Sequence, residues 1–302
     1  MANLKQLKQR IAVVNSTKKI TSAMKMVAAA KLRRSQDALN ATRPYSEGMK
    51  YLVGKLIKNV IAHGPTGQEM PLLIKGNGDD KKHLLLIVSS DKGLCGGFNS
   101  AIARLAKKTI TDLKKQGKDV QIMFVGKKAR DALISEFKDL EFKQTSKNDD
   151  NQPQKLNFFD ETVGAMIEHL FEDNAFNCCS VIYNEFVSTV TQKPTVKQVL
   201  PLNIKDFEQE FKNEENQKAD YDYEPSEKEI LEKVLPDYVQ NLISRSILES
   251  FVAENAARMT SMDAATRNAK EMINKLALIY NRTRQSMITT ELIEIISGAE
   301  AL

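Results

Sequence analysis

The sequence predicts a long antiparallel two-helix coiled coil, formed by the N- and C-terminal helices, together with a central α/β domain whose sheet is parallel and Rossmann-like. Three observations predict this fold class. Residues 1–43 contain no glycine or proline, residues 237–297 contain neither, and the chain between them alternates short apolar runs with amphipathic stretches. Long segments without helix breakers favour helices, and strands that alternate with helices favour a parallel sheet.

The N-terminal segment has the pattern of a helix with a narrow apolar stripe. Its apolar residues alternate by three and four positions, which places them on one helical face. Alanines at positions 23 and 28–30 favour a helix and would let another helix approach closely. Pro44 can kink the helix, but apolar residues beyond it indicate that the helix continues to residue 60. The stripe comprises Leu4, Leu7, Ile11 and Val14, and it resumes at Ile20, Met24 and Val27.

The C-terminal segment is long enough to need a partner helix. As one helix, residues 237–297 would measure about 90 Å, more than a compact domain of this chain can cover. The N-terminal helix supplies the partner because both segments flank one domain, so the two helices should run antiparallel. The second helix is the longer, and its apolar end at 287–296 is predicted to protrude into a socket of another protein. Five methionines are predicted to lie in the coil core: Met24, Met26, Met259, Met262 and Met272.

The middle of the chain alternates strand and helix patterns. Its apolar runs have the length of buried strands, and polar residues 143–155 read as irregular. Strands are predicted at 84–88, 120–125, 179–187 and 195–200, and helices at 101–115, 127–137 and 158–171. The predicted domains are an N-terminal coiled-coil helix at 1–60, the α/β domain at 83–202, an acidic loop at 203–225 and a C-terminal coiled-coil helix at 226–302.

Charge is unevenly distributed along the chain. The 302 residues carry a net charge of +5, but residues 1–50 hold eleven Lys and Arg against two acidic residues. Residues 205–230 hold ten acidic residues and four lysines, which is typical of a surface loop. A basic arm can bind nucleic acid, anionic lipid or an acidic protein, and a solvated helix face is an equal alternative.

Cysteine and histidine usage predicts neither a disulfide framework nor a metal site. The three cysteines are Cys95, Cys178 and Cys179, and the three histidines occur at no known ligand spacing. Small buried thiols are the simplest interpretation. The N-terminus lacks the apolar stretch of a secretory signal, and no apolar run approaches the length of a membrane span, so we expect neither export nor membrane insertion.

One glycine-rich turn is the strongest candidate for an enzyme site. The run GLCGG at 93–97 follows a predicted strand and precedes a helix, which is the generic setting of an anion site. It matches neither the dinucleotide nor the P-loop pattern, so a tight structural turn is favoured over a phosphate cradle. Neither this turn nor any other pattern in the sequence looks catalytic.

Three segments resemble the gamma subunit, the central stalk, of the bacterial and mitochondrial type of rotary ATP synthase. The first is KKITSAMKMVAAAK at 18–31, the second is SSDKGLCGGFN at 89–99, and the third is YNRTRQSMITTELIEIISGA at 280–299. They occur in the order of that family, and the resemblance covers the whole chain. The last segment is the most specific of the three.

The resemblance implies a non-catalytic rotor shaft that couples proton flow to ATP synthesis, without a cofactor or metal of its own. Its implied partners are alpha and beta subunits in a 3:3:1 ratio with one copy of this chain, epsilon and delta subunits, and a membrane c-ring. Matching positions imply contacts with the alpha/beta hexamer at Met24, Lys92, Arg258, Arg284, Gln285, Thr289 and Glu291. Lys92 is the weakest of these assignments.

The resemblance also implies a place in the cell. A starting methionine without an Arg- and Ser-rich presequence suggests a peripheral protein on the cytoplasmic face of a bacterial inner membrane. Two alternative functions remain open from the residues alone. One is a nucleotide-binding α/β enzyme that uses the turn at 93–97, and the other is a basic coiled-coil nucleic-acid-binding protein that uses residues 1–50.

Overall fold

The computed structural model describes residues 4–63, 70–141, 156–207, 223–224 and 226–300. These residues form two compact units. The paired-helix unit is Met1–Lys31 with Arg258–Leu302, and the sheet unit is Leu32–Ala257. The polar stretch predicted at 143–155, and most of the acidic loop predicted at 203–225, lie outside the described residues.

The two terminal helices extend beyond the stretches without glycine or proline at 1–43 and 237–297. α1 is one helix with Pro44 inside it, and residue 40, whose carbonyl loses its helical donor to the proline, is exposed. α7 begins before Pro236 because Ser226 accepts a hydrogen bond from the Glu229 amide at 3.3 Å and caps the first turn. The helices are α1 (Leu4–His63) and α7 (Glu227–Glu300).

The sheet unit contains a four-stranded sheet in the order β2-β1-β3-β4. β1 pairs in parallel with both β2 and β3, as predicted, whereas β4 pairs antiparallel with β3, so the sheet is mixed rather than wholly parallel. The strands are β1 (Lys82–Val88), β2 (Asp119–Val125), β3 (Cys178–Phe186) and β4 (Gln192–Leu200). The shorter helices are α2 (Leu72–Lys75), α3 (Phe98–Lys115), α4 (Lys127–Phe137), η1 (Lys138–Leu140), α5 (Leu156–Glu172) and η2 (Ile204–Phe207).

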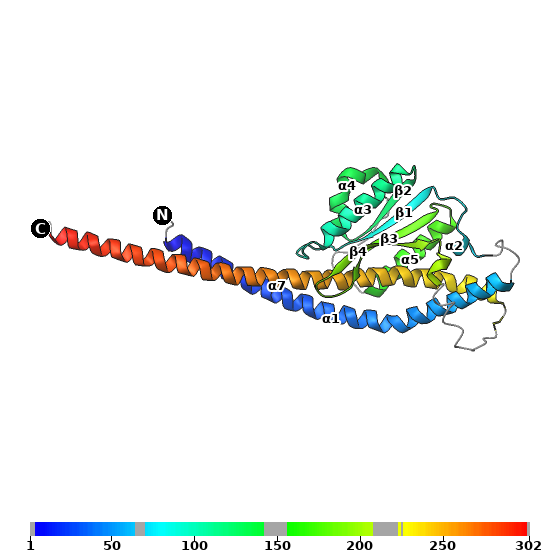
Figure 1. The fold of residues 1–302 in the computed structure, drawn as a ribbon, viewed down its shortest axis with the longest axis horizontal. Coiled ribbons are helices and arrows are strands. Elements are labelled where there is room, and N and C mark those ends of the chain that lie inside the picture. Colours follow the sequence, from blue (N-terminus) through cyan, green and yellow to red (C-terminus); the bar gives the residue numbers. More distant parts are fainter. Residues whose placement is uncertain (1–3, 64–69, 142–155, 208–222, 225, 301–302) are drawn as a thin grey trace. The chain divides into compact units, whose positions relative to one another are not determined.

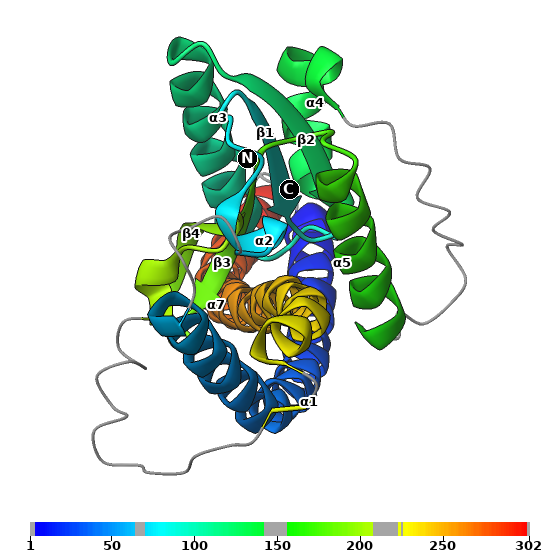
Figure 2. The same ribbon diagram turned by 90° about the vertical axis from the view of Figure 1, so that its right-hand side faces the viewer.

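Helices cover both faces of this sheet, and each face has its own apolar cluster. Alternate residues of β1 point to opposite faces. Leu85 and Ile87 pack with α3 and α4, whereas Leu84 and Leu86 pack with α5, α1 and α7. Figure 2 shows α3 and α4 on one side of the sheet and α7 with α1 on the other. The predicted α/β core is therefore present, and the terminal helices belong to it.

In the paired-helix unit, α1 and α7 run antiparallel. Thr21 lies opposite Thr266, and Lys25, one turn later on α1, lies opposite Asp263, one turn earlier on α7. The C-terminal end of α7 continues past the N-terminal end of α1 (Figure 1). Every residue from 284 to 299 is exposed, as the difference in helix length predicted.

The apolar stripe of α1 differs from the prediction beyond Val14. Ile20 and Val27 are 60% and 58% exposed, and the buried side continues through positions 18, 21, 25 and 28. Two of the five methionines are also exposed, Met26 by 64% and Met272 by 52%, so their assignment to the coil core was wrong. The seam keeps its heptad spacing with polar residues, which a search for apolar residues does not find.

Candidate partner-contact surfaces

The three cysteines are buried and unpaired, and they form no metal site with the histidines of the described residues. Cys95, Cys178 and Cys179 are free and buried, as predicted. Burial raises the pKa of the Cys178 thiol to about 11 and raises that of Cys179 as well, so both stay protonated and unreactive. Across residues 4–63, 70–141, 156–207 and 226–300, no three His, Cys, Asp or Glu side chains are grouped to hold a metal ion.

The glycine-rich turn is held by its own side chains. The Asn99 amide nitrogen donates to Ser90 Oγ at 2.7 Å and contacts Cys95 Sγ at 3.1 Å, and Ser90 Oγ donates to the Lys92 carbonyl at 2.7 Å. Cys95 and Phe98 are buried in a cluster with two alanines of α7. The polar groups of this turn therefore shape it from within, and its apolar side chains pack it against α7.

The start of α4, a helix N-terminus beside this turn, has no free amide in its first three residues. The first three amides of α4, residues 127–129, donate to Asp91 Oδ1, the Ser90 carbonyl and Ser89 Oγ at 3.1, 3.0 and 3.0 Å. A helix N-terminus beyond a parallel strand can bind an anion through such free amides. Here the chain's own carboxylate and oxygens occupy them, which argues against the nucleotide-binding alternative.

Four predicted contact residues lie together on the exposed end of α7. Arg284, Gln285, Thr289 and Glu291 are exposed, and Thr289 Oγ1 donates to the Gln285 carbonyl at 3.0 Å within the helix. At 100° per residue these positions fall within one broad face of the helix. The same face carries exposed apolar side chains: Met287, Ile288, Leu292, Ile295 and Ile296.

The other three predicted contact residues do not form one cluster with these. Met24 and Arg258 are partly exposed and belong to the paired-helix unit, whereas Lys92 is exposed in the turn of the sheet unit. Met24 is next to Lys25, whose ammonium group lies 2.6 Å from Asp263 Oδ1. That hydrogen bond lowers the pKa of the Asp263 carboxyl, so this carboxylate is ionised at neutral pH.

A further exposed apolar series was missed in the sequence. Val13, Ile20 and Val27 recur every seven residues on α1, and each is 58–60% exposed. Their spacing of seven residues could have revealed the series in the sequence. Each member lies one residue before a seam-side residue, namely Val14, Thr21 or Ala28. Apolar side chains next to a coiled-coil seam offer a surface for another chain.

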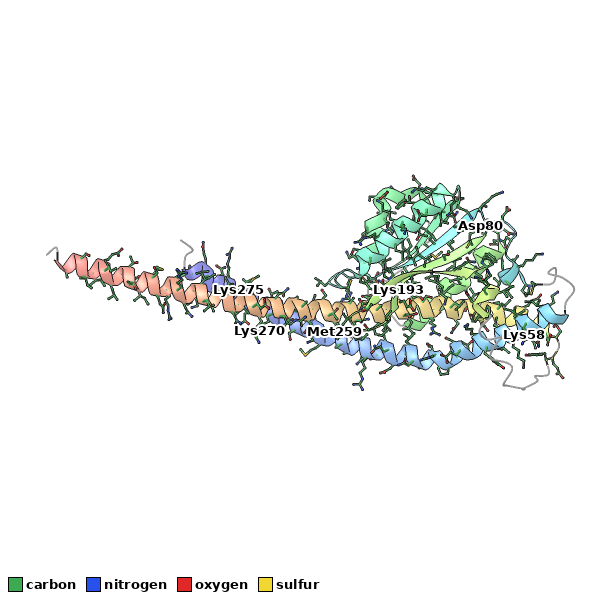
Figure 3. All side chains as sticks on the ribbon, in the orientation of Figure 1. Lys58, Asp80, Lys193, Met259, Lys270 and Lys275 are labelled. Atoms are coloured by element: carbon green, nitrogen blue, oxygen red, sulfur yellow. The ribbon has the colours of Figure 1, made fainter. Side chains whose placement is uncertain are left out.

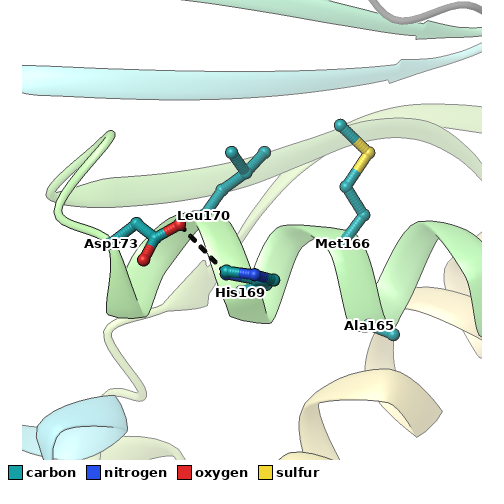
Figure 4. Close-up of a pocket in the computed structure, with 5 residues that line it drawn as sticks. All are labelled: Ala165, Met166, His169, Leu170 and Asp173. Carbon is teal, nitrogen blue, oxygen red and sulfur yellow. Dashed lines mark ion pairs between the residues drawn. The ribbon is translucent and has the colours of Figure 1, made fainter.

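The pocket on α5 is a weaker candidate. Figure 4 shows Met166, His169 and Leu170 along one side of the helix, with His169 Nδ1 paired to Asp173 at 3.0 Å. A backbone hydrogen bond and then the charge of that aspartate raise the pKa of the histidine, which is exposed. The pocket has a single short ion pair and no buried polar group, so its chemistry offers no catalytic function.

Comparisons with known proteins identify the family. The family model described as ATP synthase matches residues 3–302. The ATP synthase gamma chain of Paramagnetospirillum magneticum is 48% identical over 304 residues, covering 100% of both chains. The chain belongs to the ATP synthase gamma chain family. The gamma chain of Brucella canis is 45% identical over 303 residues, again covering 100% of both chains. The resemblance drawn from the three sequence segments is thus confirmed.

Solved structures share the fold of this gamma chain family. A chain of the Euglena gracilis mitochondrial ATP synthase, titled OSCP/F1/c-ring, has a TM-score of 0.65 at 19% identity, covering 99% of this chain and 94% of that one. A chain of the Tetrahymena thermophila mitochondrial ATP synthase, titled central stalk/cring, has a TM-score of 0.57 at 23% identity, covering 82% and 99%. The combination of long terminal helices with a central sheet is therefore a fold of rotary ATP synthases.

Proposed function

We propose that this chain is the non-catalytic rotor shaft of an ATP synthase, which couples ion flow through a membrane ring to ATP synthesis and hydrolysis by rotation. Its family membership supports this role, and the observation that carries it is the exposed apolar end of α7 at 284–299. An exposed apolar helix end in water favours association, so it needs a socket in another protein. The first three amides of α4 already bond to Asp91, Ser90 and Ser89, which supports leaving the nucleotide chemistry to the beta subunits.

The proposed mechanism rests on contacts that differ from one neighbour to the next. One shaft inside a ring of three alpha and three beta subunits cannot present the same surface to all three beta subunits. Turning it changes which beta subunit each contact stabilises, and a contact shifts a conformational equilibrium only by its differential free energy. Rotation then changes the nucleotide affinities in sequence, and reversed rotation uses ATP hydrolysis.

The proposed contacts divide into two groups. At the α7 end, Arg284 and Gln285 donate hydrogen bonds to a beta-subunit loop, with Thr289 and Glu291 in the same region. Along the coil, Met24 and Arg258 lie near an acidic segment of the beta subunit. Lys92, in the turn at 89–99, is a separate basic contact outside these two groups. The basic face of α1 favours such a partner, so these contacts should weaken at high salt.

The proposed assembly contains alpha, beta and this chain in a 3:3:1 ratio, with epsilon, delta and the c-ring, and no nucleic acid. Solved relatives in assemblies titled F1/c-ring support partners of this kind. The chain is part of a membrane-associated complex, and we place it on the cytoplasmic face of the bacterial inner membrane. Among the described residues, no helix has the length and apolarity to cross a bilayer.

Affinity purification of the tagged full-length chain tests this proposal. We expect alpha and beta subunits to copurify in a 3:3:1 ratio and the purified complex to hydrolyse ATP. Recovery of the chain alone, or with nucleic acid that leaves at high salt, would overturn the rotor function.

A single substitution then tests the contact assignment. Arg284→Ala in the assembled complex should slow coupled ATP synthesis about tenfold, because it removes a charged hydrogen bond to the partner. Arg282→Ala is the matched control, since Arg282 is also exposed but its side chain leaves the helix about 160° from that of Arg284. Equal effects of the two variants would contradict the assignment of Arg284.

A further inference from the structure

The seam of the paired-helix unit changes its chemistry partway along. Near the start of α1 the seam side carries Leu7, Ile11 and Val14, of which Leu7 is 4% exposed. Farther along, the same side carries Lys18, Thr21 and Lys25, and it then returns to the buried Ala28. A polar layer therefore interrupts an otherwise apolar and small-residue seam.

Direct side-chain contacts join the two helices at this layer. Thr266 Oγ1 donates to Thr21 Oγ1 at 2.8 Å, and Thr21 Oγ1 lies 3.1 Å from the Lys18 carbonyl, to which it can donate. Lys25 Nζ donates to Asp263 Oδ1 at 2.6 Å. The other oxygen of Asp263 lies 3.5 Å from Arg267 on the same helix, so this carboxylate serves two cations. All four residues of the layer are partly buried.

These contacts fix which residues face each other along the rest of the coil. In an antiparallel pair, moving fourteen residues back along α1 moves fourteen residues forward along α7. Thr21 faces Thr266, so Leu7 faces Tyr280, and both positions are withdrawn from solvent. From 284 onward α7 has no seam residue left, which agrees with its full exposure.

A shifted pairing would break the polar layer. Moving α7 by one heptad in one direction places Lys25 near Lys270, which gives two like charges in place of an ion pair. Lys270 lies on the exposed side of α7 (Figure 3). The opposite shift places Lys25 beside Ala256, which offers no acceptor, and Thr21 beside Met259. Polar groups in a coiled-coil seam specify register in this way, because a wrong register leaves them unpaired.

We propose that Thr21, Lys25, Asp263 and Thr266 are positioning residues that align α1 with α7 and so place Met24 and Arg258 on one contact surface. Met24 is adjacent to Lys25 in sequence, and Arg258 is five residues before Asp263, so both inherit their positions from this layer. The alignment itself concerns this chain alone. Its importance for coupling rests on the proposed rotor function.

Disulfide formation in the full-length chain tests the alignment. The Leu7→Cys and Tyr280→Cys pair reports on the seam beyond the layer, and the natural cysteines are buried. All variants also carry Arg267→Gln, so that Lys25 and Asp263 form the only ion pair studied. We expect Lys25→Asp and Asp263→Lys each to slow disulfide formation about fivefold, the factor that corresponds to losing about 1 kcal/mol. The double swap should restore the rate to within about twofold.

Lys275→Asp is the control for a simple change of charge, since its side chain is exposed and a shift of one heptad does not bring it to Lys25. It should leave the rate unchanged. Single reversals that do not slow the reaction, or a double swap as slow as either single reversal, would overturn the alignment role.

The importance of this alignment for coupling is tested in the assembled complex, with the same variants but without the added cysteines. We expect each single reversal to lower the ratio of ATP synthesis to hydrolysis, and the double swap to recover it. A lysine that merely touched a beta subunit would not be rescued by a change at Asp263, which separates the two roles. Unchanged ratios in the single reversals would overturn the positioning role, whereas a wild-type chain that fails to assemble would overturn the rotor function itself.

Discussion

The sheet unit and the paired-helix unit differ in how much of their apolar surface they bury themselves. The sheet unit has two clusters on the faces of its sheet, with wholly buried Phe171, Leu86 and Ile122 among their members. In the described part of the paired-helix unit, the buried apolar side chains are Leu7, Ala28, Met262 and Ala269. Exposed apolar residues in that unit include Val13, Ile20, Val27, Leu278 and Ile295.

This difference indicates that the two units serve different purposes. A unit that fills its own core carries stability that is independent of partners. Two helices whose seam buries few apolar side chains stabilise each other only weakly, and they leave apolar surface exposed for a neighbouring protein. The comparison therefore places the fold's stability in the sheet unit and its binding surfaces in the paired-helix unit.

The largest loss of unfolding free energy should come from truncating a side chain in the core of the sheet unit. Phe171 is fully buried, with its ring 5.6 Å from that of Phe176, so Phe171→Ala should lower the free energy of unfolding by about 3–5 kcal/mol. Leu278→Ala, at a position 72% exposed on α7, should change it by less than about 0.5 kcal/mol. Urea unfolding of the isolated chain measures both. Similar losses at the two positions would remove the contrast between the units.

A smaller loss of unfolding free energy is expected where the backbone at Gly126 approaches that at Ser89, after strands β2 and β1. Gly126 has φ +92°, and a Cβ there would collide with the Ser89 carbonyl, so Gly126→Ala should cost about 2–4 kcal/mol. Gly48→Ala, in an open and exposed part of α1, should instead stabilise the chain by about 0.5–1 kcal/mol. Thermal unfolding distinguishes the signs. A tolerated alanine at 126 would mean that this contact is not tight.

In the paired-helix unit, substitutions should lower stability at buried seam positions of α1 and not at exposed positions beside the seam. Leu7→Ala should destabilise it by about 2 kcal/mol, because Leu7 is 4% exposed, whereas Ile20→Ala should have almost no effect in the isolated chain. Loss of helical signal at 222 nm on heating reports the difference. If the two variants lost stability equally, Ile20 would belong to the seam after all.

The smallest effect concerns a half-buried carboxyl between α7 and the sheet. Burial raises the pKa of Glu249, as does the nearby charge of Glu185. The folded chain therefore holds this proton to a higher pH than the unfolded chain, so ionisation at pH 7 lowers stability. Glu249→Gln should raise the melting temperature slightly at pH 7, and the gain should fade as the pH drops toward roughly 4, where both states bind the proton.

Glu232→Gln provides the control for that prediction, because Glu232 is exposed on the same helix. It should leave the melting temperature unchanged at both pH values. A gain at pH 7 that persisted unchanged under acidic conditions would show that burial of the charge at Glu249 is not its cause.

Much of the fold was predictable because periodicity reports burial. α4 spans Lys127–Phe137, the range that the pattern predicted, and β2 begins one residue before its predicted start. The direction of β4 was missed because a strand pattern does not encode direction. The short connection from Phe186 to Gln192 could have revealed it, since so few residues permit only an antiparallel return. The predicted domain boundaries stay predictions.

The contact surfaces were predictable to a lesser extent. The exposed end of α7 followed from helix length, but the course of the α1 seam did not, since Lys18, Thr21 and Lys25 are polar residues in a position where apolar ones were sought. These polar residues fit the seam because of the α7 residues that face them across the coil. The two segments are far apart in sequence, so the pattern of α1 alone could not reveal this pairing. The roles of Arg284, Gln285 and the other contact residues come from resemblance and stay predictions.

Amide hydrogen exchange at residues 284–299 tests the central claim most directly. In the isolated chain the described residues place nothing across the seam from this exposed helix end, so its amides should exchange rapidly, while those of β1 stay protected. In the assembled complex the same amides should become protected as the helix enters its socket. Equal exchange of residues 284–299 in the free chain and in the complex would contradict the account.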